Sequence, residues 1–130
     1  MNLQSAKVSL KKPAQYIFEQ LNDVRNFEKL MPENIAKFEV TDSESFIFGL
    51  KGMPEIKLKK KAQTEFTQIV LGAASDKVPF TLTGNITPTD DESSDVQLFF
   101  EGEFNAMMAM MVKGPISKFI ETLVSNMHKL

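Results

Sequence analysis

The chain has 130 residues, of which 42% are hydrophobic and 25% are charged, and its formal net charge is -2. A chain of this length buries roughly two-thirds of its unfolded surface, so we expect one domain over residues 1–130 and little disorder. The weak negative charge gives no electrostatic reason to expect nucleic acid or an anionic membrane as a partner.

The first third of the chain predicts a strand and two short helices. Residues 5–10 alternate between apolar and polar side chains, which is the pattern of a half-buried strand. Pro13 suits the first turn of a helix, and residues 14–21 carry apolar side chains at helical spacing. Asn22 and Asp23 can then cap a second short helix.

The middle of the chain, from residue 36 to residue 104, predicts strands only. Apolar residues recur at every second position in six successive stretches that short polar turns separate, as in an antiparallel meander. The exception is the stretch 64–71, where Phe66 is out of phase with Ile69 and Leu71. This change of phase predicts a β-bulge.

The end of the chain predicts a long amphipathic helix that starts at Pro115. Apolar residues recur in it at intervals of three and four residues, as on one side of a helix. Gly114-Pro115 is expected to let the chain turn before the helix begins. The whole order predicts an α+β domain. Its twisted antiparallel sheet of seven strands would be covered by the C-terminal helix.

Two segments and the strands between them resemble a known superfamily. The segments are KKPAQYIFEQLNDVRNFEKLMPENIAKFEV and GPISKFIETLVSNM. Together they resemble the START-like, or SRPBCC (polyketide cyclase, Bet v 1-like), superfamily with its helix-grip fold, over nearly the whole chain. The resemblance implies a sheet that curves around the long helix and leaves a hydrophobic pocket between them. The superfamily includes plant allergens, polyketide cyclases, lipid-transfer domains and coenzyme-Q-binding proteins, and it has no invariant catalytic motif, so function must be argued from the site.

Four methionines stand within five positions just before Gly114, at residues 107, 108, 110 and 111. Methionine is flexible and polarisable, so it fills irregular core gaps and also lines adaptable binding surfaces. Two interpretations follow. The cluster is either loose packing where strand becomes helix, or a deformable wall over a cavity.

The eleven phenylalanines, with one tyrosine and no tryptophan, form the second pattern. Most lie on the apolar strand faces, where they predict either a close-packed core or a pocket suited to an acyl, isoprenoid or polycyclic ligand. We predict that a hydrophobic ligand is bound by a set of apolar side chains from the sheet and the last helix. The set is Phe38, Phe48, Phe80, Leu82, Phe100, Met107, Met111, Phe119, Ile120 and Leu123.

The sequence gives little support for catalysis, and we predict no catalytic residue, metal site or cofactor. Glu101 and Glu103 stand two residues apart, roughly 7 Å along a strand. They alternate with the apolar residues of that strand, so we expect their side chains to face solvent. His128 is the one histidine and the chain has no cysteine, which leaves no transition-metal cluster and no Ser-His-Asp arrangement.

Three functions stay open at this point. The first is binding of a small hydrophobic molecule, such as a lipid, quinone or polycyclic compound, for transport or sequestration. The second is a polyketide cyclase- or dehydratase-like enzyme, which would need at least two polar groups in the pocket. The third is a protein-interaction module with a closed core and an outer patch around Ile47 and Phe99.

We also expect no targeting signal. It contains no apolar run near the ~18 residues that a membrane span needs, and MNLQSAKVSLKK has no signal-peptide core. We therefore expect a cytoplasmic monomer or weak dimer without integral membrane association. Disulfides are excluded because cysteine is absent.

Overall fold

The computed structural model describes residues 1–51, 55–73 and 80–130 of the chain. Its elements follow the predicted order, with strand segments first, then two short helices, further strands and a long helix. The strands are β1 (Asn2–Gln4), β2 (Val8–Leu10), β3 (Ile35–Asp42), β4 (Ser45–Leu50), β5 (Ile56–Thr64), β6 (Gln68–Ala73), β7 (Phe80–Asp90) and β8 (Ser93–Gly102). The helices are α1 (Ala14–Asn22), the 3₁₀ helix η1 (Val24–Leu30), α2 (Ala106–Ser125) and the 3₁₀ helix η2 (Met127–Lys129).

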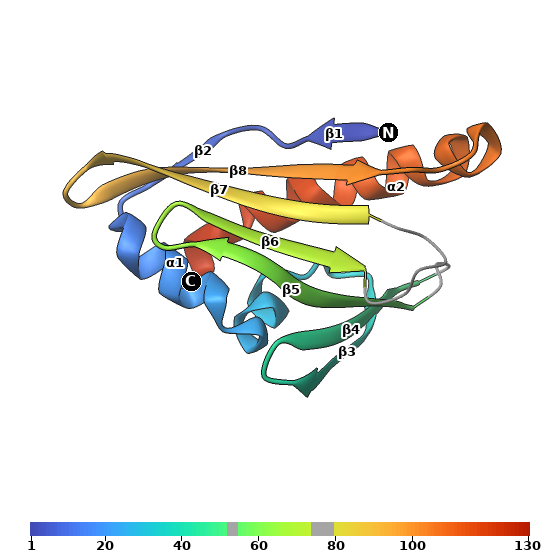
Figure 1. The fold of residues 1–130 in the computed structure, drawn as a ribbon, viewed down its shortest axis with the longest axis horizontal. Helices are drawn as coiled ribbons and strands as arrows, with labels where there is room; N and C mark the ends of the chain where they lie inside the picture. Colours follow the sequence, from blue (N-terminus) through green and yellow to red (C-terminus); the bar gives the residue numbers. More distant parts are fainter. Residues whose placement is uncertain (52–54, 74–79) are drawn as a thin grey trace.

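The strands that the structure describes form one antiparallel sheet. Its order is β1-β8-β7-β6-β5-β4-β3, and β2 pairs with β8 as well. The strands fan out from β1 at one edge to β3 at the other, and α2 runs along one face while α1 and η1 lie at one end (Figure 1). This is the predicted arrangement of a curved antiparallel sheet gripping a C-terminal helix.

The strand predicted at residues 5–10 is limited to β2, at Val8–Leu10, and β1, at Asn2–Gln4, was not predicted; both pair with β8. Ser5 lies between them, and its side chain takes part in the ladder. Its hydroxyl accepts the Leu98 N–H at 2.9 Å, while its own N–H donates to the Leu98 carbonyl at 2.8 Å. The sheet thus has seven strand positions, as predicted, with β1 and β2 sharing one of them.

The stretch around Phe66 is a turn, and the bulge predicted there was placed wrongly. β5 ends at Thr64, and Phe66 has a φ of 66°, which is unfavourable for a side chain of this size. Its ring packs edge-on against Phe18 of α1, with the ring centroids 5.7 Å apart, and this contact offsets part of the strain. The register shift lies earlier in β5, between Lys60 and Ala62.

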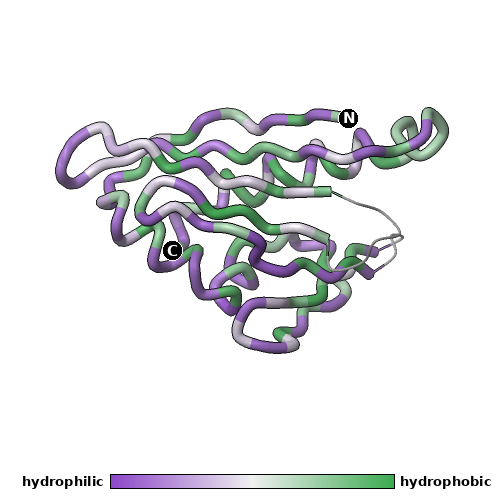
Figure 2. The backbone as a smooth tube through the Cα atoms, viewed as in Figure 1, coloured by the Kyte–Doolittle hydropathy of each residue, from purple (hydrophilic) through white to green (hydrophobic). Residues whose placement is uncertain are grey.

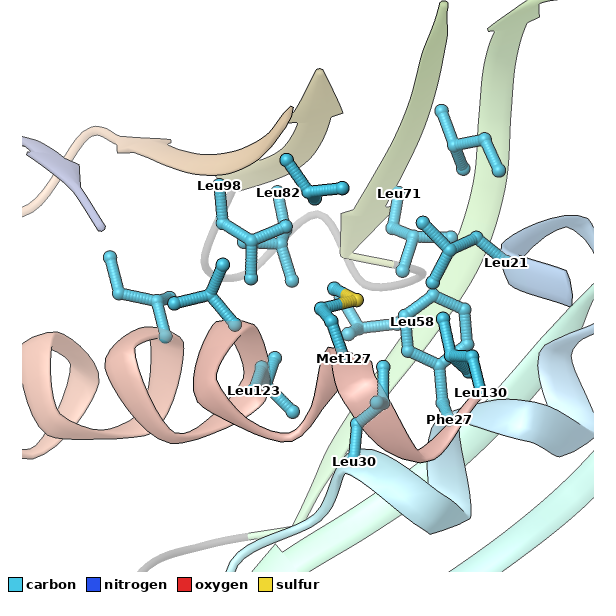
Figure 3. Packing of buried hydrophobic residues seen from close by; sticks show 14 of the residues in the cluster. Leu21, Phe27, Leu30, Leu58, Leu71, Leu82, Leu98, Leu123, Met127 and Leu130 are labelled. Carbon is cyan, nitrogen blue, oxygen red and sulfur yellow. The ribbon is translucent and has the colours of Figure 1, made fainter. Parts of the chain in front are cut away.

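The core lies where the last turns of α2, together with η1, meet the sheet (Figure 3). Leu123 and Met127 project from the helix side toward Leu58, Leu82 and neighbouring sheet residues, and all four are buried. Phe27 and Leu30 of η1 close this layer from the other side.

The long helix begins earlier than predicted, at Ala106, so the predicted start at Pro115 is wrong. Asn105 provides the cap, since its side-chain oxygen accepts the Met108 N–H at 2.8 Å and asparagine is a favoured N-cap residue. Alanine and methionine extend the helix readily. Pro115 therefore lies inside α2, where it cannot donate an N–H to the Met111 carbonyl.

Within residues 1–51, 55–73 and 80–130, no helix is both long and apolar enough to span a lipid bilayer.

Candidate functional site: an apolar cavity under the long helix

A cavity lies between α2 and four strands of the sheet, β4, β5, β7 and β8. Every described residue that lines it is apolar. The lining residues are Phe48, Leu50, Ile56, Leu58, Phe80, Leu82, Phe100, Pro115, Ile116, Phe119 and Ile120. Alternation along the strands turns these side chains toward the helix, while Lys57 and Lys59 of β5 are exposed on the opposite face of the sheet.

Stacked aromatic rings frame this cavity. Phe48 of β4 and Phe119 of α2 lie face to face, with centroids 4.8 Å apart and ring planes inclined by 3°. Phe80 of β7 stacks on Phe100 of β8 at 5.2 Å, and Phe104 continues the stack at 6.1 Å from Phe100. The first pair joins sheet to helix, so it holds the cavity closed on that side.

The cavity is small in this structure. The space open to the centre of a water molecule is ≈ 20 Å³, and one water needs roughly 10–15 Å³ by the same measure. A ligand larger than a water would therefore enter only if side chains or the helix moved.

Six of the ten predicted binding residues line the cavity. They are Phe48, Phe80, Leu82, Phe100, Phe119 and Ile120. Leu123 lies deeper and, with Leu82, lines a second space of ≈ 10 Å³. The prediction left out Leu50, Ile56, Leu58, Pro115 and Ile116, although the strand and helix patterns had already placed Leu50, Ile56, Leu58 and Ile116 on apolar faces.

The structure corrects the predicted positions of three other residues. Met107 and Met111 are 74% and 65% exposed and do not line the cavity, because the helix continues through them and turns them away from the sheet. Phe38 on β3 is half-buried and stacks on Phe46 at 5.2 Å. Figure 2 shows the resulting apolar stretch at the start of α2, at the far end of the helix from the C-terminus.

A wider groove adjoins the cavity on the outside of α2. It offers ≈ 380 Å³ to a water-sized molecule, and polar as well as apolar side chains line it. The lining residues are Pro32, Asn34, Leu50, Lys51, Gly114, Pro115, Lys118, Phe119 and Thr122. Three of them, Leu50, Pro115 and Phe119, also line the inner cavity, so these residues form the wall between the two spaces.

The candidate acids lie outside the cavity. Glu101 and Glu103 are both exposed, as their parity predicted, and neither lines the cavity. The described residues contain no group of three His, Asp or Glu side chains that could hold a metal ion.

Among the described residues, the carboxyl group of Asp23 has a strongly lowered pKa, and it stabilises the start of η1. Side-chain hydrogen bonds from Arg25 lower the pKa of Asp23 to about 2. The same carboxylate accepts the Arg25 backbone N–H at 3.0 Å and so caps η1.

The patch predicted around Ile47 and Phe99 is not formed. Both side chains are half-buried, but Ile47 is on β4 and Phe99 on β8, with β5, β6 and β7 between them. Four strand spacings separate them by about 19 Å. They therefore cannot act as one contact surface.

The comparisons with known proteins identify a fold. No protein-family model matches the chain, and no curated protein matches its sequence. Norcoclaurine synthase from Thalictrum flavum has a similar structure, with a TM-score of 0.77 and 12% identity over 99% of this chain and 84% of that chain. A protein from Thermus thermophilus has a TM-score of 0.74 and 10% identity over 99% of this chain and 95% of that chain.

A third similar structure, a conserved protein from Geobacillus kaustophilus, has a TM-score of 0.71 and 14% identity, over 99% of this chain and 93% of that chain. At such identities the likeness establishes the fold alone. The chain thus has the helix-grip fold that the resemblance implied.

Proposed function

We propose that the protein binds a small hydrophobic molecule, such as a lipid, quinone or polycyclic compound, between the sheet and α2. The observation that carries this proposal is the purely apolar lining, which includes aromatic rings from β4, β7, β8 and α2. Burial of apolar ligand surface there would contribute roughly 25 cal/mol per Å² before ordering costs. Transport or sequestration in the cytoplasm, by a monomer or weak dimer, is the role that we propose for it.

The similar structures add support at the level of the fold. Norcoclaurine synthase from Thalictrum flavum has been crystallised in complex with dopamine and hydroxybenzaldehyde. A protein with this fold therefore holds small aromatic molecules, and the stacked rings in our cavity offer the same kind of flat apolar surface.

Entry of a ligand requires the cavity to open, and the first half of α2 is the part best suited to move. Residues 106–115 are mostly exposed, and only Ala109 and Val112 are half-buried among them. A segment with little buried surface opens at low free-energy cost. Pro115, at the end of this segment, lines both spaces, so its displacement would join the inner cavity to the outer groove.

An enzyme of the cyclase or dehydratase kind is the alternative that the likeness to norcoclaurine synthase suggests. Such a reaction needs a general acid or base within reach of the substrate. The described residues lining the inner cavity supply no ionisable side chain, so we propose binding.

The proposal is tested with Nile red, a neutral polycyclic dye whose fluorescence rises in apolar surroundings. We expect saturable binding to the wild type and at least ten-fold weaker binding to Ile116→Trp, because Ile116 lines the cavity and the larger ring would occupy its space. Met110→Trp is the matched control. It adds the same ring to the same helix at a position that is 84% exposed, so its affinity should equal that of the wild type.

Native mass spectrometry of the purified protein, followed by organic extraction, gives an independent readout. A discrete added mass that extraction removes would identify the ligand class. A bare mass, together with no dye binding, would contradict the proposal and favour a protein with a closed core.

A further inference from the structure

The outer groove carries positive charge at the place where it meets the inner cavity. Lys51 follows the end of β4 and Lys118 lies on α2, and both line the groove. Their neighbours in the wall, Leu50 and Phe119, also line the inner cavity. Two ammonium groups thus stand next to the wall of an uncharged, apolar space.

These two lysines have no acidic counterpart in the groove. No described residue that lines it is an aspartate or glutamate, and none of the ion pairs formed among the described residues involves Lys51 or Lys118. Glu121, the acid nearest to Lys118 along α2, accepts the backbone N–H of Ala6 at 2.8 Å. That contact holds its carboxylate toward the β1–β2 connection.

The polar groups of the groove also favour an anion. Asn34 also lines the groove, and its side chain carries an amide N–H₂. The Thr122 hydroxyl already donates to the Lys118 carbonyl at 2.9 Å. Most of the polar hydrogens available to a ligand therefore come from Lys51, Lys118 and Asn34.

We propose that the ligand is an amphiphile with one anionic head group, held by Lys51 and Lys118 in the groove while its apolar part enters the cavity beyond Phe119. This inference rests on the proposed function and adds the chemical class of the ligand. Lysine acts as a compact point charge without a preferred planar partner, so carboxylate and phosphate heads share the chemistry that the groove recognises.

The sizes of the two spaces agree with a charged head in the groove and an apolar part in the cavity. The groove offers ≈ 380 Å³ and the cavity ≈ 20 Å³, so a hydrated head fits the groove as it stands, while the apolar part must displace the ring of Phe119. Phe119 lines both spaces and stacks on Phe48. An apolar chain that replaced this ring would keep Phe48 covered.

The test is displacement of Nile red by decanoate, decyl phosphate and decanol, which share one chain and differ in the head. The double variant Lys51→Met/Lys118→Met keeps most of each side-chain stem and removes both charges. We expect it to weaken the two anions about ten-fold, since an exposed charge pair is worth roughly two- to five-fold in affinity. Decanol binding should stay within about two-fold of the wild type, because it depends on the cavity alone.

Lys113→Met is the matched control, since Lys113 is exposed on the same helix but does not line the groove. All three ligands should bind this variant as they bind the wild type. Of decanoate and decyl phosphate, the one whose affinity falls more in the double variant carries the head group that the lysines prefer.

Two outcomes would overturn the inference and leave the proposed function intact. In the first, the double variant binds all three ligands as the wild type does. In the second, decanol weakens as much as the anions, so the lysines support the structure of the cavity. If neither the dye nor any of the three ligands binds the wild type, the proposed function itself fails.

Discussion

The two halves of α2 are both rich in apolar residues, yet only one half is buried. In the second half, Phe119, Ile120 and Leu123 are almost inaccessible to solvent. In the first half, Met107 and Met110 are 74% and 84% exposed, and Figure 1 shows this end of the helix extending past the end of β8. Apolar composition therefore did not decide burial here. The presence of a sheet opposite the helix did.

One face of the helix shows the contrast most directly. Met107 and Met111 lie in the same row as Lys118, Thr122 and Ser125, because these positions are separated by three, four or seven residues. The row is polar where the opposite face of the helix is buried and apolar where the helix extends past the sheet. A surface helix is normally polar on the face that is exposed to solvent. The first half of α2 departs from this rule, and its composition suits a segment that is exposed in one state of the protein and covered in another.

The largest expected effect comes from truncating a large apolar side chain in each half of α2 and comparing the losses of stability. Leu123→Ala should lower the free energy of unfolding by about 2–5 kcal/mol, since the truncation leaves a cavity in the core. Met110→Ala on the same helix should change it by less than about 0.5 kcal/mol. Urea denaturation measures both, and a similar loss for the two variants would contradict the distinction between the halves.

The second test concerns the junction between the halves. Pro115→Ala should raise the free energy of unfolding by about 1–3 kcal/mol, because alanine restores the N–H that the Met111 carbonyl lacks and removes the ring clash. Gly114→Ala is the adjacent control. A Cβ there would meet no atom within 4 Å, so only helix propensity changes, and the gain should be about 0.5–1 kcal/mol.

A loss of stability in Pro115→Ala would mean that the proline ring contributes more to the walls of the cavity and groove than its missing N–H costs. In that case Pro115 would belong with the buried half of α2, and the exposed half would end before it.

The smallest expected effect lies beside the buried half, at η1. Asn126 ties the end of α2 to η1 by donating to the Leu30 carbonyl at 3.0 Å, and Asp23 caps η1. The pKa of Asp23 is lowered from 3.8 to about 2 by its hydrogen bonds from Arg25. This carboxylate therefore stabilises the folded state above pH 4 and loses that effect as the pH falls toward 2.

Asp23→Asn keeps the cap but not the charge. We expect the variant to be slightly less stable than the wild type at neutral pH, and the difference to shrink as the pH falls from 4 to 2. Thermal unfolding across that range measures it. A difference at pH 2 as large as that at pH 7 would show that Asp23 acts through its shape and not through its charge.

Much of the fold was predictable because alternation along strands and spacing along helices both report burial. The parity of Phe48, Phe80, Leu82 and Phe100 placed them correctly on the cavity wall. The helix start was not predictable in this way, since the cap at Asn105 outweighed the expected break at Pro115. The methionines then followed the helix away from the sheet.

The closure of the cavity and the position of the groove could not be predicted. Closure depends on ring contacts of a few ångströms, such as that between Phe48 and Phe119, and no sequence pattern encodes such distances. Lys51 and Lys118 are far apart in the chain, and only the folded sheet and helix bring both to one groove.

The pairing of β1 and β2 with β8 has a consequence for how the chain reaches this structure. Asn2 pairs with Glu101, whereas β7 and β8 are joined by a tight hairpin. Closing the long stretch of chain between Asn2 and Glu101 costs more entropy than closing the β7–β8 hairpin. Non-local pairing of this kind also slows folding. The β7–β8 hairpin should therefore form early, and its outer edge should stay open until the first residues arrive as one of the last steps of folding.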